Sequence, residues 1–167
     1  MSRIRFLAFS VTVMAFTLIA CGTSSESTGG STGSSASPEV TFPDELIEEK
    51  IRLNIKLPKG PILASELEKL TEFSMALDLY VDNLTGLERL VNLQDFDLTQ
   101  NKTVDISPLA SLTNLTRLNL TQNDIVDVTA LAPLTNLTFL WIQDNEVVDI
   151  SALGSLTNLI ELNLQKN

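Results

Sequence analysis

The sequence predicts an α/β fold: a solenoid with a parallel sheet on its concave face, short 3₁₀ or α turns on its convex face, and a small helical N-terminal cap. The chain has 167 residues and repeats with a period of 22 from Leu93 onward. Each unit holds a short stretch in which apolar and polar residues alternate, as in a strand. A fixed period of about 20–50 residues is typical of solenoids, whose stacked units share one core.

The repeats align without gaps and begin at Leu93, Leu115, Leu137 and Leu159. Each reads L-x-x-L-x-L-x-x-N, with Phe96 and Ile142 as apolar variants. This pattern resembles the leucine-rich repeat, and its continuation, as in Asn123-Asp-Ile-Val-Asp127, is similar to the 22-residue subclass of bacterial internalin-like proteins. The resemblance implies a scaffold that binds proteins at a cell surface, and it says nothing about which protein is bound.

Residues 1–20 read as a lipoprotein signal peptide. Arg3 and Arg5 precede an uncharged apolar run over 6–20, which is short for a membrane-spanning helix. The run ends in Leu-Ile-Ala-Cys21, which resembles the bacterial lipobox and implies lipid on Cys21. Cys21 is the sole cysteine, so it cannot form an internal disulfide. The alternative is an incidental thiol after an ordinary signal peptide.

Residues 21–38 are expected to be the lipidated Cys and a flexible tether rich in Ser, Gly and Thr. From residue 22 onward the segment contains no large apolar side chain and cannot offset its ordering entropy. The lipid would then be the chain's only attachment to a membrane, and the expected location is the secreted side of the cell envelope. Gly22 in place of Asp implies the outer membrane if the organism is Gram-negative.

Residues 39–70 break the repeat and are expected to form the helical cap. Asp44 is placed to begin a helix. Its apolar residues are expected to lie mostly on one side, and they are Leu46, Ile47, Ile51 and Leu53. Pro58 follows where this helix should end. Ser65 and Glu68 have the spacing of a capping box, which predicts a second short helix.

Residues 71–167 are expected to form the repeats and to end within a repeat, without a C-terminal cap. The first turn, around Phe73, is imperfect, because its spacing slips by one residue and its Asn is lost. In the other units the strand should be followed by 3₁₀ or single α turns. The last strand would then expose an apolar edge, so weak self-association through this edge is expected.

Two polar columns are expected to hold successive coils together through hydrogen bonds to the backbone. The predicted columns consist of Asn101, Asn123, Asn145 and Asn167, and of Asp105, Asp127 and Asp149. Calcium binding is the alternative for the Asp column, but each coil offers one carboxylate where calcium prefers a cluster. Thr103 replaces the usual Ile or Val and is expected to weaken its coil.

The strand positions between the buried leucines are expected to point outward on the concave face, where a protein partner would bind. The candidate binding residues are Asp95, Asp97, Arg117, Asn119, Phe139, Trp141, Glu161 and Asn163. Phe139 and Trp141 are expected to anchor a partner, because exposed aromatic residues often dominate binding energy. The alternative is that they only cover each other and the neighbouring strands.

The charge and composition exclude several function classes. The chain has 11 basic and 21 acidic side chains, and loss of Arg3 and Arg5 with the signal leaves a formal charge of −12. Nucleic-acid binding is therefore not expected. The chain has no His, which excludes imidazole catalysis and His-ligated metals. The sequence predicts no enzyme, no cofactor and no metal.

These observations predict a non-catalytic, envelope-anchored leucine-rich repeat module that recognises a protein through its concave face. One alternative is a structural or truncated repeat module without a partner of its own. Another is a glycan-binding surface protein, since Trp141 and the neighbouring amide side chains could stack on and hydrogen-bond to sugars.

Overall fold

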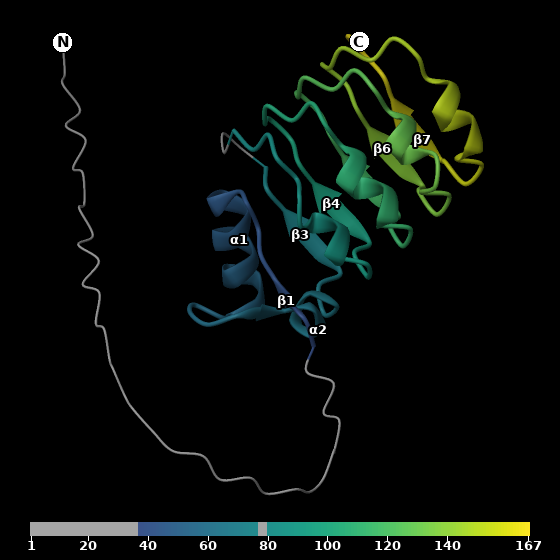
Figure 1. The fold of residues 1–167 in the computed structure, drawn as a ribbon. Coiled ribbons are helices and arrows are strands. Elements are labelled where there is room, and N and C mark those ends of the chain that lie inside the picture. Colours follow the sequence, from purple (N-terminus) through teal and green to yellow (C-terminus); the bar gives the residue numbers. More distant parts are fainter. Residues whose placement is uncertain (1–36, 77–79) are drawn as a thin grey trace, which may run out of the picture. The chain divides into compact units, whose positions relative to one another are not determined.

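The computed structural model describes residues 37–76 and 80–167 (Figure 1). The predicted signal peptide, Cys21 and the tether as far as residue 36 lie outside the described residues. None of the helices within the described ranges combines the length and the hydropathy that a membrane-spanning segment requires.

The described chain forms a small antiparallel sheet of two strands and a parallel sheet of five strands in the order β3-β4-β5-β6-β7. In chain order the elements are β1 (Glu39–Val40), α1 (Glu45–Ile55), β2 (Ile62–Leu63), α2 (Ala64–Leu67), β3 (Glu72–Ser74), the 3₁₀ helix η1 (Leu87–Arg89), β4 (Asp95–Asp97), η2 (Ser107–Ser111), β5 (Arg117–Asn119), η3 (Thr129–Leu131), β6 (Phe139–Trp141), η4 (Ser151–Ser155) and β7 (Glu161–Asn163).

Helix α1 begins after Asp44, whose Oδ1 accepts hydrogen bonds from the backbone N–H groups of Leu46 (2.8 Å) and Ile47 (3.2 Å). This N-cap satisfies two of the donors that a helix leaves free at its start. Ile47 and Ile51 are buried. The expectation that Leu46 and Leu53 share their side is wrong, because these two side chains are 37% and 65% exposed.

The capping box predicted for the second helix is not formed. Helix α2 begins one residue before Ser65, and no side chain caps it. The preceding segment supplies the acceptors instead: the Ala64 N–H donates to the Pro38 carbonyl and the Ser65 N–H donates to Ser37 Oγ, each at 2.9 Å. Pairing of β2 with β1 brings these acceptors to the helix, so a capping side chain is not needed.

Strands β3 to β7 run side by side in parallel, and the 3₁₀ turns line the opposite side of the coils (Figure 1). From β4 onward the register repeats with the sequence: Asp95 is opposite Arg117. At β3 the register is shifted by one residue, since Glu72 pairs with Asp95. The irregular first turn expected from the sequence therefore still supplies a strand to the same sheet. This combination of sheet and short turns confirms the predicted solenoid.

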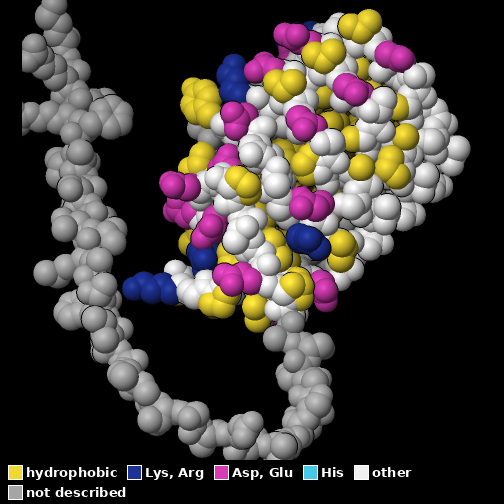
Figure 2. Space-filling view, in the orientation of Figure 1, with side chains coloured by type: hydrophobic (Ala, Val, Ile, Leu, Met, Phe, Trp, Pro, Cys, Tyr) yellow, Lys and Arg dark blue, Asp and Glu magenta, His cyan; other side chains and the backbone are white. Residues whose placement is uncertain are grey.

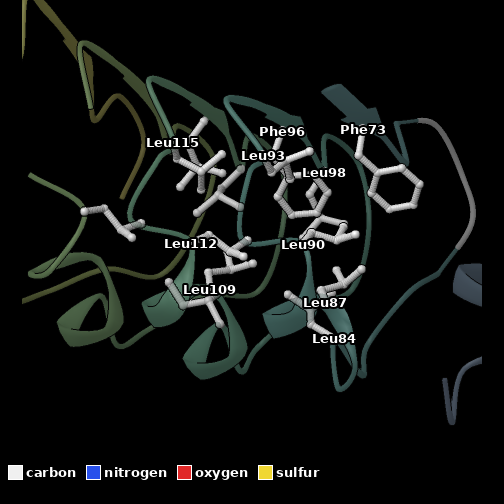
Figure 3. Packing of buried hydrophobic residues seen from close by; sticks show 14 of the residues in the cluster. Phe73, Leu84, Leu87, Leu90, Leu93, Phe96, Leu98, Leu109, Leu112 and Leu115 are labelled. Atoms are coloured by element: carbon white, nitrogen blue, oxygen red, sulfur yellow. The ribbon is translucent and has the colours of Figure 1, made fainter. Parts of the chain in front are cut away.

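The core runs between the sheet and the 3₁₀ turns. Figure 3 shows leucines of successive coils, such as Leu90 and Leu112, stacked beside one another. Phe73 and Phe96 stack at the start of this column, with ring centroids 5.9 Å apart and planes inclined by 9°. Each coil therefore buries its apolar side chains against the next one.

The asparagine after each strand bonds to the backbone of its own coil and of the preceding coil. Asn123 Nδ2 donates to the carbonyls of Leu98 (3.0 Å) and Leu120 (3.0 Å), and its Oδ1 accepts from the Thr103 N–H (3.2 Å). The residue before each asparagine lies in the left-handed region, and these residues are Gln100, Gln122, Asp144 and Lys166. This backbone turns the chain sharply, and the asparagine satisfies the groups that the turn leaves without partners.

The aspartate column begins the convex turns. Asp105, Asp127 and Asp149 each accept, at 2.8 Å, the backbone N–H of the residue two positions later. The hydrogen bonds from Ser107, first through its backbone and then through its side chain, lower the pKa of Asp105 from its ordinary value of 3.8. The equivalent bonds from Ser151 lower the pKa of Asp149.

Comparison of the repeats predicts that Thr103 weakens its coil. In the structure Thr103 is buried, and its hydroxyl donates to the Val81 carbonyl at 2.8 Å. In the two following coils a backbone N–H makes the corresponding bond: Asp124 donates to Thr103, and Glu146 donates to Ile125. The Thr103 hydroxyl thus bonds a carbonyl at the irregular first turn, where Ile or Val could not.

Within the described residues, β7 pairs with a strand on one side only, with β6. Its inward-facing Leu162 is 41% exposed, whereas the equivalent Leu140 of β6 is fully buried. Ile160, just before the strand, is 77% exposed. This edge therefore presents both apolar side chains and backbone hydrogen-bonding groups.

Candidate functional site

The exposed face of the parallel sheet consists of two rows of side chains, which we call the concave face. Each row crosses all five strands, because corresponding residues are paired in register. The first row is Glu72, Asp95, Arg117, Phe139 and Glu161, and the second row is Ser74, Asp97, Asn119, Trp141 and Asn163. The residue between the two rows on each of strands β3 to β6 points into the core and is buried.

Arg117 joins the acidic and aromatic parts of the concave face. Its Nε lies 3.3 Å from Asp95 Oδ2, and about half of each of these two side chains is exposed. The guanidinium carbon lies 5.1 Å from the centroid of the Phe139 ring and 5.8 Å from that of Trp141. A cation over an aromatic ring is attracted to its negative face, so Arg117 is held from two sides.

Phe139 and Trp141 form the aromatic part, which we call the ring pair. Both come from β6, two residues apart, so they point to the same face of the sheet. Their ring centroids are 5.9 Å apart with planes inclined by 29°, and both side chains are half-buried. Trp141 Nε1 donates to Glu161 Oε1 on the next strand at 2.6 Å. The ring pair is therefore oriented by neighbours on both sides before any partner arrives.

The second row is used mainly for turns at the ends of the strands. Asp97, Asn119 and Asn163 each accept the backbone N–H of the residue two positions later, at 3.0–3.1 Å. Asn163 also donates to Gln143 Oε1 of the neighbouring coil. Asp and Asn favour such local bonds, so these three residues stabilise the chain turn as well as lining the face.

The first strands of the sheet enclose a shallow acidic hollow of about 370 Å³. Its lining residues are Asn54, Glu72, Phe73, Ser74, Asp95 and Asp97. Glu72 and Ser74 are absent from the residues proposed from sequence, because the register of the first turn is shifted by one residue. The alternation Glu72-Phe73-Ser74-Met75 was the signal that could have found them.

The structure thus connects five of the eight candidate residues through direct contacts: Asp95, Arg117, Phe139, Trp141 and Glu161. Asp97, Asn119 and Asn163 lie in the second row together with Trp141. Over residues 37–76 and 80–167, no three His, Cys, Asp or Glu side chains gather closely enough to hold a metal ion. The concave face is open and carries aromatic and charged groups.

No protein-family model matches the chain, and no curated protein matches it. Among solved structures, an internalin (inlF) from Listeria monocytogenes is similar, with 37% sequence identity and a TM-score of 0.72. The match covers 74% of this chain and 37% of the internalin. A leucine-rich repeat protein from Leptospira interrogans is similar with 26% identity and a TM-score of 0.56, over 60% of this chain and 26% of the other.

The functional domain of InlJ from Listeria monocytogenes, which includes a cysteine ladder, matches with a TM-score of 0.60 and 22% identity, and this likeness concerns the fold alone. The match covers 77% of this chain and 34% of that domain, so the chain spans 26–37% of the length of these three neighbours. The repeat pattern, the five-stranded parallel sheet and these neighbours together show that the chain is a leucine-rich repeat protein.

Proposed function

We propose that the chain is a non-catalytic, internalin-like module that recognises a protein partner through its concave face. The observation that carries the proposal is the ring pair of Phe139 and Trp141, held by Arg117 and Glu161 on an otherwise polar surface. Aromatic side chains held in place lose little entropy on binding and are the usual anchors of protein interfaces.

The variation between coils supports this proposal. The buried positions repeat almost unchanged, as Leu118 and Leu140 illustrate, because each coil must pack against the next. At the first row of the concave face the residue changes from Asp95 to Arg117 to Phe139. Folding does not require this variation, and exposed apolar groups gathered on one face are typical of interaction sites.

A lipid anchor on Cys21 is the second part of the proposal and rests on the sequence of residues 1–38. The anchor would hold the repeats near a membrane at the cell envelope, on its secreted side. Substitution of Cys21→Ser should abolish lipid modification and leave an uncleaved or misrouted precursor. If the Cys21→Ser variant still remains with the membranes after carbonate washing and has the same mature mass as the wild type, the lipid anchor is wrong. That result would not bear on the concave face.

Glycan binding is less well supported than protein binding. A sugar stacks on a free indole face, but the ring of Trp141 already contacts Phe139 and Arg117, and its N–H is bonded to Glu161. In a repeat module without its own partner these contacts would serve only packing between neighbouring strands, and thermal unfolding of the variants below measures that contribution. The ring pair therefore favours a protein partner, to which it would add apolar contact area.

The experiment is a binding comparison with the mature, full-length chain. A panel of purified envelope and cell-surface proteins, together with a glycan panel, is tested against wild type, Trp141→Ala and Val148→Ala. Val148 is the control, because it is an apolar side chain that is 89% exposed and lies outside the two rows. We expect Trp141→Ala to weaken protein binding by about 2 kcal/mol or more, and Val148→Ala to leave it unchanged.

Thermal unfolding of the same variants separates binding from folding. A large fall in melting temperature for Trp141→Ala would show that the ring pair serves packing and would remove the main support for the proposal. Loss of glycan binding alone would favour the glycan-binding alternative. Equal binding by wild type and Trp141→Ala across both panels would contradict recognition through the ring pair.

A further inference from the structure

The concave face is acidic at the end formed by β3 and β4. Glu72, Asp95 and Asp97 line the hollow there, and Glu161 lies at the other end of the first row. Arg117 is the only basic side chain in the two rows, and it is already bound by Asp95 and the ring pair. The concave face therefore keeps unneutralised negative charge beside its aromatic anchor.

The charge of the whole molecule has the same sign. The formal net charge is −10, and acidic side chains are spread over the surface shown in Figure 2, where basic ones are few. A partner with basic residues is attracted by this field, whereas an acidic partner is repelled. The carboxylates thus set the sign of the partner's charge, and the ring pair sets the place of its apolar contact.

The spacing of the strands gives the separation of these two features. Neighbouring strands lie about 4.8 Å apart, so the ring pair on β6 is about 12 Å from the hollow between β3 and β4. An extended chain rises about 3.3 Å per residue, and side chains two or four residues apart point to the same side. Four residues span about 13 Å, whereas two span about 7 Å, which is too short.

We propose that the concave face recognises an extended protein segment in which an apolar or aromatic residue and a Lys or Arg are four positions apart. The apolar side chain packs on Phe139 and Trp141, and the basic side chain enters the hollow beside Glu72, Asp95 and Asp97. The segment crosses the strands of the sheet. This inference rests on the proposed function and adds to it the chemistry and the spacing of the partner.

Synthetic peptides test this inference with the full-length mature chain. Each peptide has a Ser/Gly background and one Trp, with a Lys placed two, three or four positions away, in both chain directions. Matched peptides carry Glu in place of Lys or Ser in place of Trp. Fluorescence polarisation at low and high salt gives the affinities for wild type, Trp141→Ala, Glu72→Lys and Val148→Ala.

We expect the peptide with Trp and Lys four positions apart to bind best, and its binding to weaken as salt rises. Trp141→Ala should weaken binding about tenfold or more, and Glu72→Lys about threefold or more, with improved binding of the Glu peptide. Val148→Ala should bind as the wild type does. Glu72 makes no side-chain hydrogen bond or ion pair within the described residues, so its substitution should leave the fold intact.

Three results would overturn the inference. They are equal or better binding of the Glu peptides, affinities that do not depend on spacing, and no binding by any peptide at millimolar concentration. If Glu peptides bind in a Trp141-dependent manner, or if only whole proteins of the panel do so, the proposed function stands and the basic partner is wrong. If neither peptides nor proteins respond to Trp141→Ala, both proposals fail.

Discussion

Substitution of Asn123 by Ala tests how the coils are held together. Asn123 is 6% exposed. Its side-chain amide accepts a hydrogen bond from one backbone N–H and donates to three backbone carbonyls. Two of these carbonyls, those of Leu98 and Leu120, also accept from the asparagines of the neighbouring coils, Asn101 and Asn145. The N–H of Thr103 has the Asn123 side chain as its acceptor.

The magnitude follows from these shared bonds. Asn123→Ala leaves the buried Thr103 N–H without an acceptor, which costs about 1–3 kcal/mol. Loss of the second donor to each carbonyl adds about 1–2 kcal/mol, so we expect about 3 kcal/mol of destabilisation. Asn167→Ala is the matched control, because its bonds have the same geometry but the residue is exposed. Water can replace those bonds, so its cost should stay below about 1 kcal/mol.

A double-mutant cycle sharpens the test. Asn101 and Asn123 both donate to the Leu98 carbonyl, so removing both leaves that buried carbonyl without either donor. We therefore expect the pair to cost about 1–2 kcal/mol more than the sum of the single changes. Asn101 and Asn145 share no carbonyl, so this pair should be additive.

Urea unfolding followed by circular dichroism measures these free energies of unfolding. Additive behaviour of Asn101 and Asn123, or equal costs for Asn123→Ala and Asn167→Ala, would refute the view that shared, buried hydrogen bonds hold the coils together. In that case the asparagines would act within single coils only.

Three further predictions concern other parts of the fold. Thr103→Val should destabilise the protein by about 1–2 kcal/mol despite its greater hydrophobicity, because a buried carbonyl loses its hydroxyl donor; a more stable variant in the same urea assay would contradict this. The lowered pKa values of Asp105 and Asp149 mean that their ionised forms stabilise the fold above pH 3.8, and that this contribution is lost as pH falls through the lower folded-state pKa. Asn substitutions at both positions should therefore reduce the acid sensitivity of the unfolding midpoint, and an unchanged pH profile would exclude that role. In a polypeptide made of these 167 residues, Leu162 is 41% exposed beside a strand edge that has no partner within the described residues. We expect such a polypeptide to self-associate weakly. A sedimentation mass independent of concentration, with β7 as protected from hydrogen exchange as β5, would argue against this.

The repeat itself was determined by the sequence alone. Leu98, Leu120 and Ile142 recur at one period, and alternation with polar residues assigns them to the buried side of short strands. Because every coil must stack on a near-copy of itself, the order of the strands and their register from β4 onward follow from the period. The concave rows follow as well, since side chains alternate along a strand.

The tertiary structure decided what the period does not describe. The shifted register of β3 brought Glu72 into the first row, and the pairing of β1 with β2 replaced the capping box expected at Ser65. These outcomes depend on contacts made by irregular segments, where no neighbouring copy shows the pattern.

The contacts of the ring pair were likewise decided by the tertiary structure. The sequence placed Phe139 and Trp141 on the concave face, but their contacts with Arg117 and Glu161 join residues that are 20–24 positions apart in the chain. Long side chains on neighbouring strands can adopt several rotamers, and only the packed sheet determines which partners they meet. The repeat period determines the strand position and the face of the sheet from which a side chain projects. The three-dimensional packing determines which residues that side chain contacts.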